Sequence, residues 1–254
     1  MPLTQKEIDL FNEQGFLPRE GLLNALEVKA LHLRLEDIGN EVVEFPAEYV
    51  QIEPMVKSGE IVEDSVRFNN VRKIWNLTKY DELFKEYARH PAILDVVHSL
   101  IGPNLKIYLD QTLCKPPKIG SPKPPHQDSA YWTNIDPPNL VICWMALDDA
   151  TEENGCMRFI PGSHKLGVVE HKHLEDFRVE DEKVDYDNEI CVPLTAGGCS
   201  FHHSLAMHRT DANRSPDRRI GLTVAYMNAE SKYVGPQPQP EYELVTGQHF
   251  AGCV

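Results

Sequence analysis

Residues 124–132 read Pro124-Pro125-His126-Gln127-Asp128-Ser129-Ala130-Tyr131-Trp132. His126 and Asp128 are two positions apart, and in an extended segment this spacing points both side chains to one face. The proline-rich approach, residues 122–125, stiffens the chain just before them, as a metal site requires of its ligands. Alone, a histidine beside an aspartate is more often a hydrogen-bonded surface pair, so a metal site needs a third ligand from elsewhere.

His208, in the segment Leu205-Ala206-Met207-His208-Arg209-Thr210, is the best candidate for that ligand. Two histidines and one carboxylate on one side of a metal form the facial triad of non-haem Fe(II) oxygenases. Arg219 follows eleven residues after His208, and a guanidinium can grip a carboxylate through two parallel hydrogen bonds. Zinc with a bound water, in a hydrolase, is the competing interpretation. The arginine favours iron, because zinc hydrolysis does not require it.

This ordered set of residues resembles the phytanoyl-CoA dioxygenase family, a branch of the Fe(II)/2-oxoglutarate oxygenases. The likeness runs through most of the chain. It includes Phe11-Asn12-Glu13-Gln14-Gly15-Phe16-Leu17, Lys115-Pro116-Pro117, His126-Gln127-Asp128, Glu153-Asn154-Gly155-Cys156, Pro161-Gly162-Ser163-His164, His208 and Arg219-Ile220-Gly221-Leu222.

The resemblance implies a mainly β fold with flanking helices, a double-stranded β-helix of the jelly-roll or cupin-like barrel type. It implies Fe(II) on His126, Asp128 and His208, and 2-oxoglutarate with its far carboxylate on Arg219. O₂ would be the second cosubstrate and ascorbate the expected reductant. The implied reaction hydroxylates a small organic substrate and releases succinate and CO₂. Asp128 favours hydroxylation, because related halogenases carry a small residue there.

Further residues are expected to line the pocket. The resemblance gives Thr210 a hydroxyl contact to the cosubstrate carboxylate and places Trp144 in the wall of the cosubstrate pocket, although a lone tryptophan in a strand is as often plain core. Gln111, Lys115 and Tyr131 are further candidates. Three other histidines lack triad spacing and are interpreted as structural: His164, His202 and His203.

Capping residues and hydrophobic periodicity predict where the helices and strands lie. A capping box at Thr4 and Glu7 predicts a helix ending near Gly15, and Asn24 with Glu27 predicts a second one. Residues 39–72 are weakly periodic and are expected to be surface loops or, by resemblance, to border the substrate. A helical pattern covers residues 81–100 with a break at Pro91. Strands are predicted for 105–113, 140–147, 157–160, 189–192, 198–202 and 218–227.

The direction of the strand at 218–227 can be predicted. If Arg219 points inward, the small residues Gly221, Thr223 and Ala225 do so too, and should leave room for a cosubstrate. Ile220, Leu222, Val224 and Tyr226 then pack outward against helices, and Arg218 faces outward as well. Arg209 and Arg214 are expected to be exposed to solvent.

We expect one oxygenase domain over residues 1–254. Residues 1–104 would form a mainly helical part, 105–230 the barrel core with an inserted loop at about 165–188, and 231–254 a C-terminal extension. Residues 170–189 are rich in charged side chains and predict a solvated loop, with a lid as the alternative.

The net charge of the chain makes some classes of binding partner less expected. With 25 basic and 39 acidic residues the net charge is −14, which disfavours nucleic acid and anionic membranes and makes a strongly anionic CoA ester less expected, although a local basic patch could accept one. Six scattered cysteines fit neither a zinc ribbon nor a disulfide scaffold. No secretory signal is visible, so we expect a cytoplasmic enzyme acting on a small molecule. A non-catalytic binding protein on the same barrel is an alternative, and the oligomeric state is not indicated.

Overall fold

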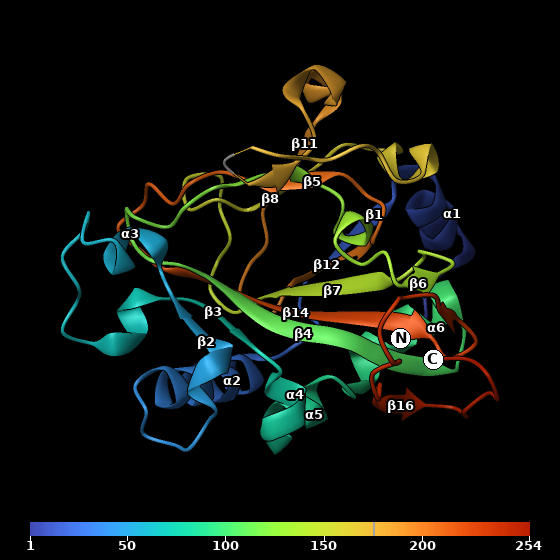
Figure 1. Ribbon diagram of the computed structural model, residues 1–254, viewed down its shortest axis with the longest axis horizontal. Helices are drawn as coiled ribbons and strands as arrows, with labels where there is room; N and C mark the ends of the chain where they lie inside the picture. The colour runs from blue at the N-terminus through green and yellow to red at the C-terminus, as the bar shows by residue number, and fades with distance from the viewer. Residues whose placement is uncertain (175) are drawn as a thin grey trace.

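The computed structural model describes residues 1–174 and 176–254, and it consists mainly of two antiparallel sheets that face each other (Figure 1). The larger sheet has the order Phe16–Arg19 (β1), Cys199–His203 (β12), Val141–Ala146 (β7), Arg219–Asn228 (β14), Leu105–Lys115 (β4), Val71–Trp75 (β3) and Val50–Ile52 (β2), and Leu244–Thr246 (β16) also pairs with β4. The smaller sheet has the order Ile190–Val192 (β11), Met157–Phe159 (β8), His208–Thr210 (β13) and Lys123–His126 (β5). The predicted fold class is confirmed, although the described strands form two open sheets and no closed barrel.

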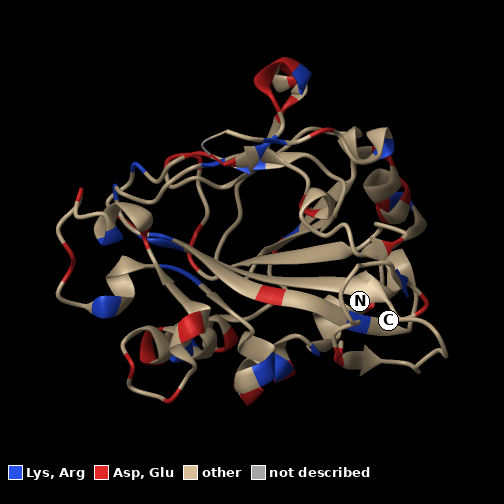
Figure 2. Cartoon of the chain, in the orientation of Figure 1, with Lys and Arg blue, Asp and Glu red and all other residues tan. Residues whose placement is uncertain are grey.

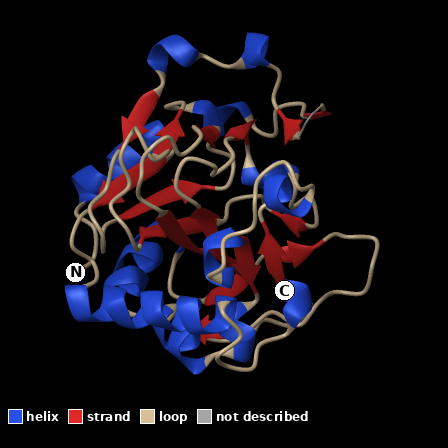
Figure 3. Ribbon diagram, turned by 90° about the vertical axis from the view of Figure 1, so that its left-hand side faces the viewer, coloured by secondary structure: helices blue, strands red, loops and turns tan. Residues whose placement is uncertain are grey.

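Two short ribbons and a set of helices complete the chain. The ribbons pair Ile135–Asp136 (β6) with Lys232–Tyr233 (β15) and Lys172–His173 (β9) with Phe177–Arg178 (β10). The α-helices are Gln5–Gln14 (α1), Ala25–Gly39 (α2), Pro54–Lys57 (α3), Leu77–Tyr80 (α4), Glu82–Tyr87 (α5) and Pro91–Ile101 (α6). Figure 3 shows most of the helices gathered along one side of the strands. No helix among residues 1–174 and 176–254 is long and apolar enough to cross a membrane.

The helix ends form as their sequences predict, because capping satisfies backbone donors locally. Thr4 and Glu7 make a capping box at α1, and Gly15 ends that helix in the left-handed conformation with φ of 86°. Asn24 and Glu27 make the same arrangement at α2. The break predicted at Pro91 separates α5 from α6.

The main core lies between the helices and the larger sheet, and it confirms the predicted direction of β14. Ile220, Leu222, Val224 and Tyr226 are buried there with residues of α2, α5 and α6. Arg218 also lies on the helical side, where it pairs with Glu36 of α2 at 3.1 Å. The opposite face of β14 is turned toward the smaller sheet, and this leaves Arg219 and Thr223 in the space between the sheets.

Strand β4 changes face in its middle, which its alternating pattern did not predict. Ala225 pairs with Leu109 and Tyr226 with Ile107, so Tyr108 is an extra residue in a β-bulge. Because one inserted residue reverses every later side chain, Ile107 faces the helices whereas Leu109 faces the smaller sheet.

Two stretches predicted as loops are more ordered than expected. Residues 39–72 contribute β2 and the first residues of β3 to the edge of the larger sheet. In the inserted loop at 165–188, Val179 and Val184 are buried against Ile160 and Met207. The backbone N–H of Val179 also donates to the carbonyl of Pro125, so the solvated-loop interpretation is wrong for this part. Residue 175, within that loop, lies outside the described residues.

Candidate functional site

The smaller sheet brings the three predicted metal ligands together. His126 ends β5 and His208 begins β13, and the two are direct cross-strand partners with ring centroids 4.2 Å apart. Asp128 follows in the short 3₁₀ helix Asp128–Ala130. One potential ligand atom from each of the three residues lies within 4.8 Å of the others. The chain therefore has a His–Asp–His metal site.

Backbone carbonyls orient both imidazoles. Nδ1 of His126 lies 2.8 Å from the carbonyl oxygen of Pro124, and Nδ1 of His208 lies 3.0 Å from that of Ala206. A carbonyl only accepts, so each Nδ1 carries the proton and donates it, which leaves each Nε2 lone pair free for a metal. Nε2 of His126 lies 3.8 Å from Oδ1 of Asp128, so both groups face one point.

The surroundings of the three ligands favour the protonation states that bind a metal. Burial lowers the pKa of His208 to about 4, and burial together with His208 holds the pKa of His126 well below its ordinary value. Burial by itself would raise the pKa of Asp128, but His208, His202 and His126 outweigh it and hold this pKa below its ordinary value. Metals bind neutral imidazole and ionised carboxylate, so these directions suit a divalent cation.

His202 belongs to this site, contrary to its interpretation as structural. Its Nε2 lies 3.4 Å from Oδ2 of Asp128, and the side chain lines the cavity beside the triad. The signal was the alternation of β12: Cys199 and Phe201 pack in the helix-facing core, so His202 must face the other way. His164 and His203 do not line the cavity, as predicted.

Arg219 is a buried cation without a carboxylate. The residue is 2% exposed, and its guanidinium makes only long hydrogen bonds, 3.3 Å to the carbonyl of Gly155 and 3.4 Å to that of Leu113. No carboxylate of the described residues lies within 4.0 Å of it. Burial lowers the pKa of Arg219 to about 10. A buried charge without a counterion is unfavourable, so this site suits an anionic ligand.

Three buried polar atoms in this wall of the cavity have no hydrogen-bond partner within the described part of the chain. They are Nε of Arg219, Nε1 of Trp144 and Oγ1 of Thr223. The Trp144 ring lies 5.2 Å from the Arg219 guanidinium carbon. Because buried polar groups are normally hydrogen-bonded, three unsatisfied polar atoms in one wall of the cavity indicate the place of a polar ligand. This donor set fits 2-oxoglutarate, and the triad beside it fits Fe(II).

The cavity between the sheets encloses about 400 Å³ and contains the metal ligands and Arg219. All the other predicted pocket residues line it: Gln111, Lys115, Tyr131, Trp144 and Thr210. Tyr131 lies toward the inserted loop, where its hydroxyl donates to the carbonyl of Phe177 at 2.6 Å. Sequence reasoning named no function for Gln51, Arg72, Lys73, Lys123 or Asp176, which also line the cavity.

Gly221 was expected to leave room for a cosubstrate. In the structure it makes room for the Trp144 ring instead. A Cβ at Gly221 would lie 2.3 Å from Cζ2 of the indole. Thr223 is the small residue of β14 that faces the cavity, whereas Ala225 is buried with Ile142 in a separate apolar cluster.

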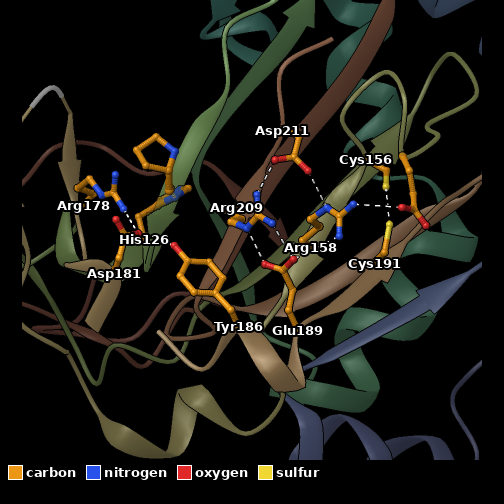
Figure 4. Close-up of polar contacts among 12 residues, drawn as sticks. His126, Cys156, Arg158, Arg178, Asp181, Tyr186, Glu189, Cys191, Arg209 and Asp211 are labelled. Atoms are coloured by element: carbon orange, nitrogen blue, oxygen red, sulfur yellow. Dashed lines mark hydrogen bonds and ion pairs between the residues drawn. The ribbon is translucent and has the colours of Figure 1, made fainter. Parts of the chain in front are cut away.

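The outer face of β13 carries an ion-pair network (Figure 4). Arg209 pairs with Glu189 and Asp211, both at 2.6 Å, and Arg158 of β8 pairs with the same two carboxylates at 3.2 and 2.9 Å. Arg209 is thus partly buried, contrary to expectation, whereas Arg214 is exposed as predicted. The network ties β13 to β8 and to the start of β11, and so supports the strand that holds His208.

Known proteins are similar to this chain in sequence. A phytanoyl-CoA dioxygenase domain-containing protein 1 from Danio rerio is 28% identical, covering 92% of this chain and 94% of its own length. The peroxisomal phytanoyl-CoA dioxygenase of Rattus norvegicus is 26% identical, covering 91% and 70%.

Solved structures agree with the fold. EctD from S. alaskensis, with 2-oxoglutarate and 5-hydroxyectoine, superposes with a TM-score of 0.78 at 18% identity and covers 99% of this chain and 86% of that one. The epimerase SnoN, in complex with Fe³⁺, alpha ketoglutarate and nogalamycin RO, gives 0.72 at 22% identity, covering 97% and 96%. The model of the family described as phytanoyl-CoA dioxygenase (PhyH) matches residues 11–221. This match, over most of the chain and all four residues of the predicted centre, shows that the protein belongs to the phytanoyl-CoA dioxygenase family of 2-oxoglutarate-dependent oxygenases.

Proposed function

We propose that this chain is an Fe(II)- and 2-oxoglutarate-dependent dioxygenase that hydroxylates a small organic substrate and releases succinate and CO₂. The observation that carries the proposal is the buried guanidinium of Arg219, which has no carboxylate partner among the described residues and lies in the same cavity as the triad. A metal site alone would not call for a buried cation. A metal site that shares its cavity with one suits a dicarboxylate that reaches both.

Each residue has a defined part in this proposal. His126, Asp128 and His208 hold the metal, and the carbonyls of Pro124 and Ala206 fix the imidazoles that present Nε2 to it. When bound, the iron and 2-oxoglutarate supply the oxidising chemistry by which one atom of O₂ enters succinate and the other enters the product.

The wall around Arg219 orients the cosubstrate. Arg219 holds its far carboxylate, and the hydroxyls of Thr210 and Thr223 and Nε1 of Trp144 are donors within the same wall. Trp144 and Met157 are 1% and 3% exposed, so they exclude water from this side of the cavity. Gln111 and Tyr131 also line the cavity, where they can contact a substrate or the cosubstrate.

The test is succinate formation by purified protein supplied with iron, ascorbate, 2-oxoglutarate and ¹⁸O₂. We expect slow succinate release without substrate, because the metal and cosubstrate sites come from this chain alone, and faster release with a substrate that becomes labelled. His126→Ala is the matched inactive control. Iron-loaded protein that makes no more succinate than this control would favour a binding protein. Native zinc with ester or amide cleavage would favour a hydrolase.

Three wider predictions accompany the proposal. Residues 1–254 form one oxygenase domain, its partners are small molecules and not nucleic acid or membranes, and it acts in the cytoplasm. Fractionation of cells decides the last of these, and recovery with peroxisomes, as the name of the Rattus norvegicus relative indicates for that protein, would contradict it.

A further inference from the structure

Two cysteines that are distant in the sequence meet at the edge of the smaller sheet. Cys156 directly precedes β8, and Cys191 is the middle residue of β11. Their Sγ atoms lie 3.0 Å apart, although 35 positions separate them in the chain. Figure 4 shows both thiols beside the ion-pair network of β13. Because β8 and β11 are antiparallel neighbours, a bond between the two sulfur atoms would link adjacent strands.

The exposure of this pair differs from that of the other close pair of thiols within the described chain. Cys143 and Cys199 approach to 3.1 Å, but both are 0% exposed in the helix-facing core. Cys191 is partly exposed to solvent, whereas Cys156 is buried. A small oxidant can therefore reach Cys191, and Cys156 is in place to attack the intermediate that forms there.

The surroundings of the pair make its oxidation slow at neutral pH. Burial raises the pKa of Cys191, although its contact with Cys156 and the charge of Arg158 both oppose this effect. Figure 2 shows basic residues along the smaller sheet, and Arg158 of β8 is one of them. Burial and the contact with Cys191 raise the pKa of Cys156 to about 12. Because the thiolate is the attacking species, oxidation should become faster as the pH rises.

Cys156 lies in the same backbone segment as the wall that surrounds Arg219. The preceding residue, Gly155, accepts the 3.3 Å hydrogen bond from the Arg219 guanidinium through its carbonyl. The following residue, Met157, lines the cavity. The Cys156 side chain is buried with that of Trp144 in one apolar cluster. A change at the thiol pair therefore acts on groups that border the proposed cosubstrate site.

This segment has little room to move independently of its surroundings. A Cβ at Gly155 would collide with the carbonyl oxygen of Asp211, so the backbone is packed directly against the chain that follows β13. The backbone N–H of Cys156 donates to the carbonyl of Thr151 at 2.8 Å. A covalent bond between two sulfur atoms is shorter than their present contact, so oxidation draws Cys156 toward Cys191. The Gly155 carbonyl, one residue away, must respond to that movement.

We propose that Cys156 and Cys191 form a reversible disulfide that lowers the affinity of the chain for 2-oxoglutarate. The oxidant is a small-molecule disulfide of the glutathione class. The Cys191 thiolate attacks one of its sulfur atoms and one small thiol leaves, after which the Cys156 thiolate attacks the Cys191 sulfur and releases the second. The two protein thiols lose two electrons, and their protons end on the two released thiols. The regulatory part rests on the proposed function, since it assigns Arg219 to 2-oxoglutarate.

Equilibration of the full-length protein with graded ratios of reduced to oxidised glutathione tests the bond. After acid quenching and alkylation, peptide mass spectrometry should find Cys156 joined to Cys191, and dithiothreitol should reverse the link. Cys191→Ser and Cys156→Ala should form no such link. Cys253→Ser, which removes another partly exposed cysteine, is the matched control and should form it. Absence of the peptide at the most oxidising ratio, or a link between Cys143 and Cys199 in its place, overturns the inference.

Calorimetric titration of 2-oxoglutarate measures the consequence. Reduced and oxidised proteins are freed of glutathione and loaded anaerobically with Fe(II). Oxidation should weaken binding by roughly 3- to 10-fold, the effect of misplacing about one hydrogen-bonding group, and dithiothreitol should restore it. The affinities of Cys191→Ser and Cys156→Ala should not respond to the glutathione ratio.

The two measurements separate this inference from the proposed function. Unchanged 2-oxoglutarate affinity in protein whose Cys156 to Cys191 link has been verified overturns the regulatory inference. An equal response to glutathione in Cys191→Ser overturns it as well. Reduced wild-type protein that does not bind 2-oxoglutarate contradicts the proposed function, and with it the regulatory part, while the peptide analysis still decides whether the bond forms.

Discussion

Replacing Arg219 by methionine separates a ligand-binding role from a structural one. Arg219 is 2% exposed, has no carboxylate partner within the described residues, and its guanidinium reaches two carbonyls only at 3.3 and 3.4 Å. It therefore contributes little to the unliganded fold while its burial carries a desolvation penalty. Methionine is of similar length and uncharged. We expect Arg219→Met to fold, and to melt at or above the temperature of the unliganded wild type.

Binding should respond in the opposite sense. Loss of one member of a buried ion pair costs roughly 3–5 kcal/mol, which is an affinity loss of roughly a hundredfold to a few thousandfold at about 1.4 kcal/mol per factor of ten. At about 100 times the dissociation constant, a ligand stabilises the fold by ~2.7 kcal/mol. For a chain of this size, that amounts to roughly 5–10 °C in melting temperature at ~2–4 °C per kcal/mol. The variant should show no such shift.

The assay is calorimetric titration of 2-oxoglutarate together with thermal melts, with and without the ligand. Arg218→Met is the matched control, because Arg218 directly precedes Arg219 but pairs with Glu36 and lies over the Phe68 ring. It should bind 2-oxoglutarate normally and lose some stability. Equal binding losses in the two variants, or a lower melting temperature for Arg219→Met with unchanged binding, would refute the assignment of β14 and of its arginine.

Three other outcomes are expected. Wild-type protein should bind one Fe(II) per chain in an anaerobic titration, and His208→Ala should lose this binding. His164→Ala, which changes a residue outside the cavity, should still bind iron. Full iron stoichiometry in His208→Ala would contradict the ligand set. His202→Phe should weaken iron binding by roughly 10–100-fold, as for other groups that hold a metal ligand, because Nε2 of His202 lies 3.4 Å from Asp128; unchanged iron affinity argues against that contact. Burial lowers the pKa of Lys115 to about 6, so above that pH the unfolded state binds more protons than the folded state. The free energy of unfolding should therefore rise between pH 6 and 9, and Lys115→Met should make this rise smaller. If urea titrations of both proteins give the same dependence on pH, Lys115 is not its source.

The sequence by itself determined what depends on neighbours a few positions away. The capping boxes at Thr4 and Asn24 close hydrogen bonds within one turn, so the starts of α1 and α2 are legible without the fold. The alternation of β14 has a period of two, and one outward aliphatic row places Arg219 on the inner face. The spacing of His126 and Asp128 is equally local.

Only the tertiary structure decided features that depend on which strand lies beside which. The bulge at Tyr108 is defined by pairing between β4 and β14, more than a hundred residues apart, and it places Ile107 and Leu109 on opposite faces of the sheet. His202 meets Asp128 because β12 of the larger sheet and the residues that follow β5 of the smaller sheet line the same cavity, although the two residues are 74 positions apart in the chain. Net charge likewise concealed a basic cavity, because the charge of a chain is a sum over its surface, whereas a ligand responds to the few groups that folding gathers around it.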